Sequence, residues 1–248
     1  MTDLKIENLT FAYDERSEAP IFERLNLTAA PGEFLSILGP SGCGKSTLLN
    51  ILSGALTSYD GRIAVGGETT RGISSHFACM PQDDLLIPRR NILDNACLYG
   101  TLHGKKKEYR AMAMKNMELF GLSGYERAYP SQLSGGMRQR AAFLRTALCP
   151  ADIMLLDEPF GALDVITRGD MQDWLLSVRG ELNRTTILVT HDIDEAIRLS
   201  DRILAMKGRP AIFAGEFIPG PKGRQREERL ARAPLWEKIY ACLQSETR

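Results

Sequence analysis

The sequence FLSILGPSGCGKST, residues 34–47, joins a short apolar run to a glycine-rich turn. The run Phe34–Leu38 is typical of a buried strand, and the pattern G-x-x-x-x-G-K-[ST] begins directly after it. Glycines let the backbone wrap closely, so that its N–H groups point at phosphate oxygens. A helix expected over 46–53 adds its positive N-terminal end. The sequence therefore predicts a phosphate-binding loop formed by Gly39, Pro40, Ser41, Gly42, Cys43, Gly44, Lys45, Ser46 and Thr47.

Two side chains of this loop suit ATP with Mg²⁺. Lys45 supplies a mobile positive charge for the β and γ phosphates, and the Ser46 hydroxyl can ligate the metal. An incidental glycine-rich turn is the alternative, and the flanking strand and helix weigh against it. Cys43 fills a loop position and is given no catalytic role. We therefore expect ATP and Mg²⁺ as the cofactors.

Two carboxylates follow a second apolar run, Ile153–Leu156. A buried strand there would deliver both acids to its end, beside the phosphate loop. Asp157 is suited to hold Mg²⁺ through water, and Glu158 can reach a water beyond the γ-phosphate, as a general base requires. Two surface acids opening a turn before Pro159 are the alternative. With the phosphate loop present, we favour hydrolysis of ATP.

The remaining pattern alternates strands and helices, which indicates a largely parallel sheet with helices on both faces. Two N-terminal segments, 4–13 and 21–27, read as strands of an antiparallel region. Further strands are expected at 61–65, 77–80, 153–156, 186–190 and 202–206, and helices at 92–103, 108–120, 137–149, 168–182, 193–199 and 235–243. The stretch 84–150 is dominated by helical patterns. We predict one α/β domain over 1–248, with a core of 1–83 and 151–210, an inserted helical subdomain at 84–150 and a tail at 211–248.

The composition is that of an ordinary globular protein, with 44% hydrophobic and 25% charged residues. Lysine plus arginine equals aspartate plus glutamate, 31 against 31, so there is no basic surplus to indicate a nucleic-acid partner. The charged runs 105–107 and 222–232 are interpreted as solvated. Five widely spaced cysteines favour a reducing compartment over disulfides or zinc. Neither a signal peptide nor a run of the roughly 18 apolar residues that span a bilayer is expected.

The segment LSGGMRQR, Leu133–Arg140, has the character of a second anion nest. Ser134 or the glycines open a helix, so free N–H groups and a helix N-terminus point outward. A chain with two such nests either holds two anions or shares one with another copy, and a bare helix start is the further alternative. The residues alone leave these possibilities open.

Followed shortly by LLDEP, this segment resembles the signature sequence of ABC-type ATPases, and the resemblance runs from about Leu4 to Gly208. It implies a P-loop NTPase core with an antiparallel β region and an inserted α-helical subdomain. It also implies a homodimer packed head to tail, with ATP at the interface. Ser134, Gly135 and Gly136 would then touch the γ-phosphate bound by the second copy.

The resemblance extends to four further residues. Gln82 resembles the glutamine that senses Mg²⁺ and the attacking water, and Asp164, in GALD, resembles the loop along the dimer interface. His191 resembles the switch histidine that contacts the γ-phosphate, and Tyr13 the aromatic that stacks on adenine, with Phe11 a weaker candidate. Taken alone, Gln82 could be a polar loop residue, Asp164 a helix N-cap, His191 a solvated strand end and Tyr13 an edge aromatic.

The family also implies partners outside this chain. Integral membrane permease subunits would dock on the helical subdomain near Asp84–Pro88, although these residues could instead simply pack that subdomain. A solute-binding protein would act indirectly, and the chain would lie peripherally on the cytoplasmic face of the cell membrane. PFGALD together with LSGGMRQR resembles importers of nitrate, sulfonates, taurine, bicarbonate or thiamine precursors. Competing hypotheses are the ATPase of an exporter or lipoprotein-release system, a nucleotide-gated interaction module, and a phosphotransferase. The last would leave LSGG and the paired acids without a role.

Overall fold

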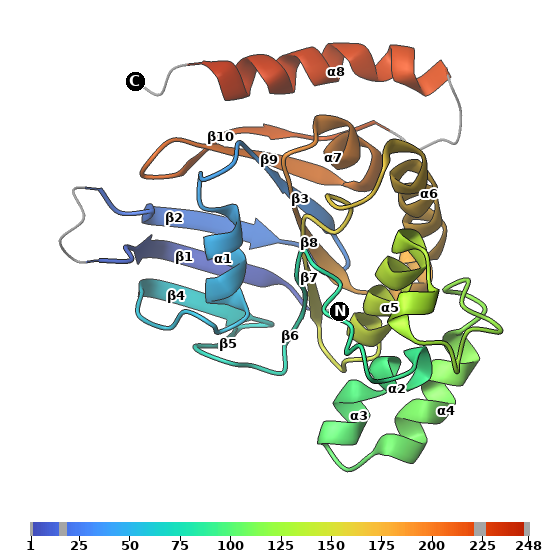
Figure 1. Cartoon of the computed structure of the whole chain (residues 1–248). Helices are drawn as coiled ribbons and strands as arrows, with labels where there is room; N and C mark the ends of the chain where they lie inside the picture. Colours follow the sequence, from blue (N-terminus) through green and yellow to red (C-terminus); the bar gives the residue numbers. More distant parts are fainter. Residues whose placement is uncertain (1, 15–18, 221–226, 246–248) are drawn as a thin grey trace.

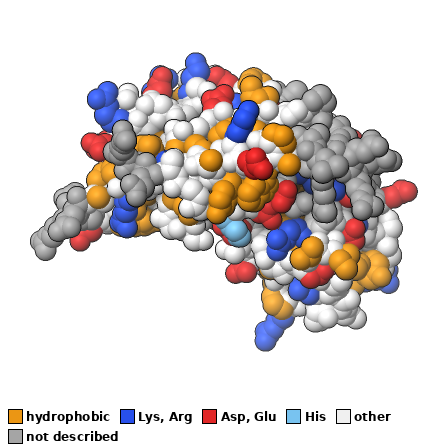
Figure 2. All heavy atoms as spheres, turned by 90° about the horizontal axis from the view of Figure 1, so that it is seen from above, with side chains coloured by type: hydrophobic (Ala, Val, Ile, Leu, Met, Phe, Trp, Pro, Cys, Tyr) orange, Lys and Arg blue, Asp and Glu red, His pale blue; other side chains and the backbone are white. Residues whose placement is uncertain are grey.

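The computed structural model describes residues 2–14, 19–220 and 227–245, and the side chains of the last segment from residue 233. Two sheets lie side by side, and a helical arm extends from the larger one (Figure 1). In that view β1, β2, β4 and β5 lie to the left, helices α2 to α5 to the lower right, and α8 across the top. Acidic and basic side chains are interspersed on the face seen from above in Figure 2.

The larger sheet forms the centre of the molecule and runs in the order β10-β9-β3-β8-β7-β6. Its strands are β3 (Phe34–Leu38), β6 (Phe77–Met80), β7 (Ile153–Asp157), β8 (Thr185–Thr190), β9 (Arg202–Lys207) and β10 (Ile212–Phe217). All neighbours pair in parallel except β9 and β10. Every residue of β3 and β8 is buried, as expected of strands covered on both faces. The predicted parallel sheet is confirmed.

The smaller sheet is antiparallel where its strands pair and runs β2-β1-β4-β5. It comprises β1 (Leu4–Phe11), β2 (Phe22–Ala29), β4 (Asp60–Val65) and β5 (Glu68–Thr69), of which the sequence did not predict β5. Apolar side chains from β1 and β2 pack against α1 (Lys45–Leu52) and the larger sheet in one buried cluster. This cluster fixes α1, and with it the phosphate loop, against the strands.

The helical arm departs from the prediction at its first helix. The expected helix at 92–103 is wrong, because it is divided at Cys97 into α2 (Ile92–Ala96) and α3 (Leu98–Leu102). Its second half turns to lay Gly100 against Tyr109 of α4 (Lys106–Asn116), where an added Cβ would come within 2.3 Å of the ring. After the short η1 turn (Pro130–Gln132), α5 (Gly135–Ala147) packs on α6 (Val165–Leu182).

The C-terminal segment also differs from the predicted tail. Ile212–Phe217 forms β10 on the edge of the larger sheet, and the expected short helix extends over Glu227–Gln244 as α8. That helix packs its Trp236 and Ile239 on α7 (Ile193–Leu199). The charged run predicted at 222–232 lies outside the side chains that the structure describes. Among the described helices, none combines the length and apolar character that a bilayer crossing requires.

Candidate functional site

The phosphate loop leaves the end of β3 and enters α1. Gly42 and Gly44 have φ angles of 80° and 107°, which glycine adopts without the penalty that a Cβ imposes. The turn is also tightly enclosed, since a Cβ on Gly44 would lie 2.8 Å from Ile21. Lys45 is only 4% exposed, and its Nζ donates to the carbonyls of Gly39 at 2.8 Å and Pro40 at 2.9 Å. The ammonium group therefore lies across the loop.

Ser46 and Asp157 meet beside this loop. The Ser46 hydroxyl donates to Oδ1 of Asp157 over 3.1 Å. Burial raises the pKa of Asp157, the negative charge of Glu158 adds to that effect, and the bond from Ser46 opposes it. A partly buried carboxylate next to a hydroxyl, with a second acid beside it, forms an oxygen-rich site that a divalent cation would stabilise. These two residues fit Mg²⁺ as the sequence predicts.

Glu158 and His191 form a second pair at the same edge of the sheet. Glu158 follows β7, His191 follows β8, and Nδ1 of His191 lies 3.0 Å from Oε2 of Glu158. The Glu158 backbone has a φ angle of 42°, which is uncommon for a residue with a side chain. Its N–H donates to Val189 O at 2.9 Å, which anchors this turn to β8. The Glu158 side chain is 17% exposed and that of His191 is 54% exposed, so a water on the open side can reach both.

Tyr13 and Gln82 lie at the rim of this region. The Tyr13 hydroxyl is 3.0 Å from Thr47 Oγ1, and the residue is 64% exposed. Phe11 is buried and meets the Tyr13 ring edge to face, so only Tyr13 offers a free face. A Cβ on Gly161 would lie 3.6 Å from Nε2 of Gln82 and 3.8 Å from Oε2 of Glu158, which places the Gln82 amide near the acid. The structure thus brings Tyr13 to the phosphate loop and Gln82 to the neighbourhood of Glu158.

Two comparisons with curated proteins give high similarity over nearly the whole chain. It is 43% identical to the aliphatic sulfonates import ATP-binding protein SsuB 1 of Rhodococcus jostii, over 92% of this chain and 90% of that protein. It is also 43% identical to the formylaminopyrimidine import ATP-binding protein ThiZ of Halalkalibacterium halodurans, over 98% and 97%. The ABC transporter family matches residues 22–161. The chain belongs to the ABC transporter family.

A solved structure supports the same assignment. A dimeric ATP-binding cassette in a post-hydrolysis state, bound to ADP and Pi, superposes with a TM-score of 0.72 at 29% identity, covering 88% of this chain and 99% of that one. With the family shown and the site geometry in place, this chain is an ATP-binding ATPase subunit of the ABC type.

The ABC signature lies elsewhere on the molecule. The Ser134 hydroxyl accepts from Met137 N at 3.3 Å and so caps α5. Figure 1 shows α5 and α1 on opposite sides of the central strands. Within one chain, therefore, the structure does not bring Ser134, Gly135 and Gly136 to the phosphate loop.

Asp164 caps a helix. Its Oδ1 accepts from Ile166 N and Thr167 N, both at 3.1 Å, and hydrogen bonding to Thr167 lowers the pKa of this exposed group. The N-cap alternative is thus the structural role within one chain. Nearby, a cavity of about 340 Å³ is lined by residues from three motifs, including Gln82, Gly135 and Leu163. The loop at Asp164, the signature and Gln82 therefore share one cleft.

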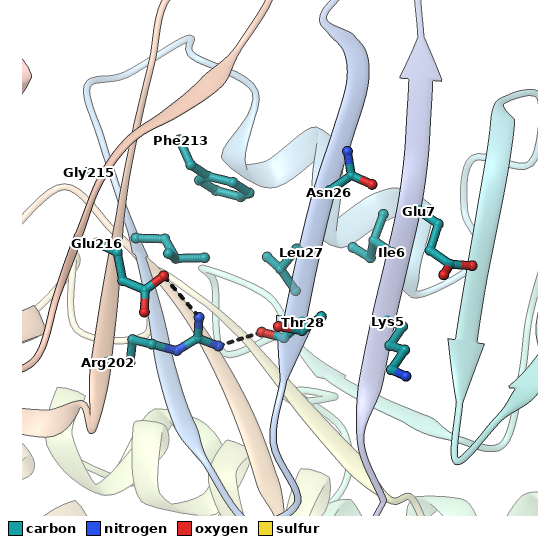
Figure 3. Close-up of a pocket in the computed structure, with 11 residues that line it drawn as sticks. Lys5, Ile6, Glu7, Asn26, Leu27, Thr28, Arg202, Phe213, Gly215 and Glu216 are labelled. Carbon is teal, nitrogen blue, oxygen red and sulfur yellow. Dashed lines mark hydrogen bonds and ion pairs between the residues drawn. The ribbon is translucent and has the colours of Figure 1, made fainter.

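A second groove, of about 620 Å³, lies between β1, β2, β9 and β10, away from these motifs (Figure 3). Arg202 at its base bonds Glu33 at 2.6 Å and lies 3.5 Å from Glu216. The hydrogen bond to Glu33 contributes most to raising the pKa of Arg202, and Glu216 adds to this effect. The arginine is thus already paired and presents no free charge to a ligand.

Sequence reasoning missed two residues beside His191. Asp192 caps α7 by accepting from Glu195 N at 3.1 Å, and Arg168 approaches Asp192 with Nη1 3.5 Å from Oδ2. The signal was present as D-x-x-E at 192–195, which resembles a capping box at a helix start. The proximity of Arg168 depends on how α6 packs, and no local pattern carries it.

Proposed function

We propose that this ABC subunit binds ATP between two copies packed head to tail and hydrolyses it to drive solute import through a separate membrane permease. One observation carries the proposal. Ser46 with Asp157, and Glu158 with His191, flank one phosphate loop at the carboxyl ends of β3, β7 and β8. Ligands of open α/β sheets bind at that edge.

Each residue then has a role in hydrolysis. The loop N–H groups and Lys45 bind the phosphates, and Tyr13 stacks on adenine. Ser46, Asp157 and Gln82 would hold Mg²⁺, which neutralises charge on the β and γ phosphates when bound. Glu158 orients the attacking water and accepts its proton, while His191 contacts the γ-phosphate and fixes the Glu158 carboxylate through their 3.0 Å contact.

The second copy completes the site. Ser134, Gly135 and Gly136 end at a helix N-terminus whose first N–H groups are open to an anion, and this terminus lies away from its own phosphate loop. Asp164 lies on the loop that shares a cleft with it. In the head-to-tail dimer, the signature of one copy faces the γ-phosphate that is bound by the other copy. Asp164 then lies along the interface between the two copies. The dimeric cassette with ADP and Pi supports this arrangement.

The solute and the partners are proposed from the relatives. Similar proteins are import ATP-binding proteins for sulfonates, taurine and nitrate, and another serves a formylaminopyrimidine. We therefore expect a small anion or a thiamine precursor, delivered by a solute-binding protein to permease subunits. The helical subdomain at 84–150 would receive the permease near Asp84–Pro88, where Leu85 is 60% exposed. The chain would then lie at the cytoplasmic face of the cell membrane.

Glu158→Gln tests the shared site. This change should abolish hydrolysis yet keep ATP binding, because the amide preserves shape but accepts no proton. Light scattering should then show a monomer that becomes a dimer only with Mg-ATP. The matched control is the double variant Glu158→Gln with Ser134→Glu. The added glutamate places a negative charge against the phosphate of the partner copy, so this variant should stay monomeric and still bind ATP. ATP-loaded Glu158→Gln that stays monomeric, or hydrolyses normally, would contradict the proposal.

A further inference from the structure

Glu195 is a buried carboxylic acid on the first turn of α7, the helix that follows His191. It is only 4% exposed, and in the described part of the chain its Oε1 atom has no hydrogen-bond partner. Burial raises the pKa of Glu195 to about 8, with the charge of Asp192 adding to this effect and a hydrogen bond from Thr190 opposing it. Buried polar atoms normally have a hydrogen-bond partner. A carboxyl oxygen without one indicates that Glu195 has a role other than packing.

Arg168, like Glu195, has a buried polar atom without a hydrogen-bond partner. Its Nε is buried and has no partner among the described residues, although its charge is one of those acting on Glu195. The rest of the guanidinium is engaged on two sides. Nη2 donates to Leu163 O at 3.1 Å, and Nη1 lies 3.5 Å from Asp192 Oδ2. Arg168 therefore connects the loop that carries Asp164 to the start of α7.

The same network holds both neighbours of His191. Asp192 accepts the Glu195 N–H at 3.1 Å and donates its own N–H to Thr190 Oγ1 at 3.0 Å. The Thr190 hydroxyl also bonds the Glu195 carboxyl. Thr190 and Asp192 flank His191, so the backbone that aims His191 at Glu158 is fixed from both sides by contacts that include Glu195.

We propose that Glu195 is a positioning residue for hydrolysis, which with Arg168 fixes the backbone of His191 and ties it to the loop around Asp164. This inference rests on the proposed role of His191. Because Arg168 also donates to the Leu163 carbonyl, a partner copy that packs against this loop displaces Arg168 and, through its contact with Asp192, the turn that carries His191. The network thus links closure of the dimer to the geometry of the acid–histidine pair.

Glu195→Ala in the full chain gives the first test. A small displacement of a catalytic group costs on the order of tenfold to a hundredfold in rate, so kcat should fall by such a factor while the KM for ATP is unchanged. Glu195→Gln, which keeps the shape and the acceptor for Thr190, should restore most of the loss. Arg168→Ala should lower kcat in the same way and add little to Glu195→Ala.

The deciding experiment repeats Glu195→Ala in a His191→Ala background, with melting temperatures as a check of folding. If Glu195 acts through His191, the single-turnover rate of the double variant equals that of His191→Ala. An equal loss in both backgrounds, or a raised KM with unchanged kcat, would overturn this inference alone. Wild-type turnover by His191→Ala would overturn the proposed role of His191 as well.

Discussion

At the scale of single residues, we expect Glu195 to make the stability of the protein depend on pH. Its pKa is raised to about 8 in the folded chain, so the folded state binds a proton that the unfolded state releases at lower pH. The free energy of unfolding should therefore fall as pH rises from the ordinary carboxyl range through 8, by at most about 1.4 kcal/mol per pH unit. Glu195→Gln lacks that proton, and urea unfolding across pH should show a flatter dependence than the wild type.

The control for this prediction is Glu237→Gln, which changes an exposed acid of α8. It should leave the pH slope of the wild type in place. Parallel slopes for the wild type and Glu195→Gln would contradict this prediction, because they would mean that Glu195 is ionised in the folded chain. Burial and the charges of Asp192 and Glu158 favour the protonated form, whereas Thr190 and Arg168 favour the ionised form.

The sequence predicts which residues meet where chemistry imposes a spacing. Lys45, Asp157 and Glu158 follow buried strands by a fixed number of residues, so their meeting at one edge follows from the strand pattern. The pairing of Arg168 with Asp192 depends on how α6 lies against α7, which no local pattern records. Asp164 shows the converse, because a single aspartate satisfies both a helix cap and an interface loop.

At the scale of elements, a buried lysine of β9 ties down the C-terminal end of α8. Lys207 is 7% exposed, and its Nζ donates to Cys242 O at 3.0 Å and to Ser245 O at 2.7 Å. A cation at the open carbonyls of a helix C-terminus is stabilising, and hydrogen bonds to charged groups contribute about 2 kcal/mol each. Lys207→Met should thus remove about 2 kcal/mol or more from the unfolding free energy and speed hydrogen exchange in 236–244 first.

Lys238→Met is the matched control, since Lys238 is an exposed lysine of the same helix. It should leave both the unfolding free energy and the exchange pattern unchanged. Uniform exchange changes over the whole chain in Lys207→Met would show that α8 does not detach as a unit.

The sequence missed much of this C-terminal region for a physical reason. Along β10 no residue is buried, and intermediate and exposed positions do not alternate strictly, so no clear period-two pattern marks it as a strand. Its existence depends on pairing with β9, from which it is separated only by a turn at Gly208. In contrast, β3 and β7 are largely apolar and β8 is rich in β-branched residues, so the parallel sheet followed from them. The divided helix at Cys97 likewise depends on the distant Tyr109.

At the scale of the whole molecule, the separation of the phosphate loop from the signature has a consequence that mixing experiments can measure. In a head-to-tail dimer, each site takes Lys45 and Glu158 from one copy and Ser134 from the other. Lys45→Ala alone and Ser134→Glu alone should both be inactive, because each damages both sites. A mixed dimer, however, contains one site built only from wild-type halves.

Random mixing places half of the dimers in this class, each with one of two sites intact, so the mixture should recover up to about a quarter of wild-type turnover. The matched control mixes Lys45→Ala with Glu158→Gln. Both changes lie on the phosphate-loop half, so every site in that mixture is damaged and no activity should return. Recovery in both mixtures, or in neither, would refute an ATP site shared between the two copies. Recovery in the first alone requires that Ser134 acts on the phosphate held by its partner.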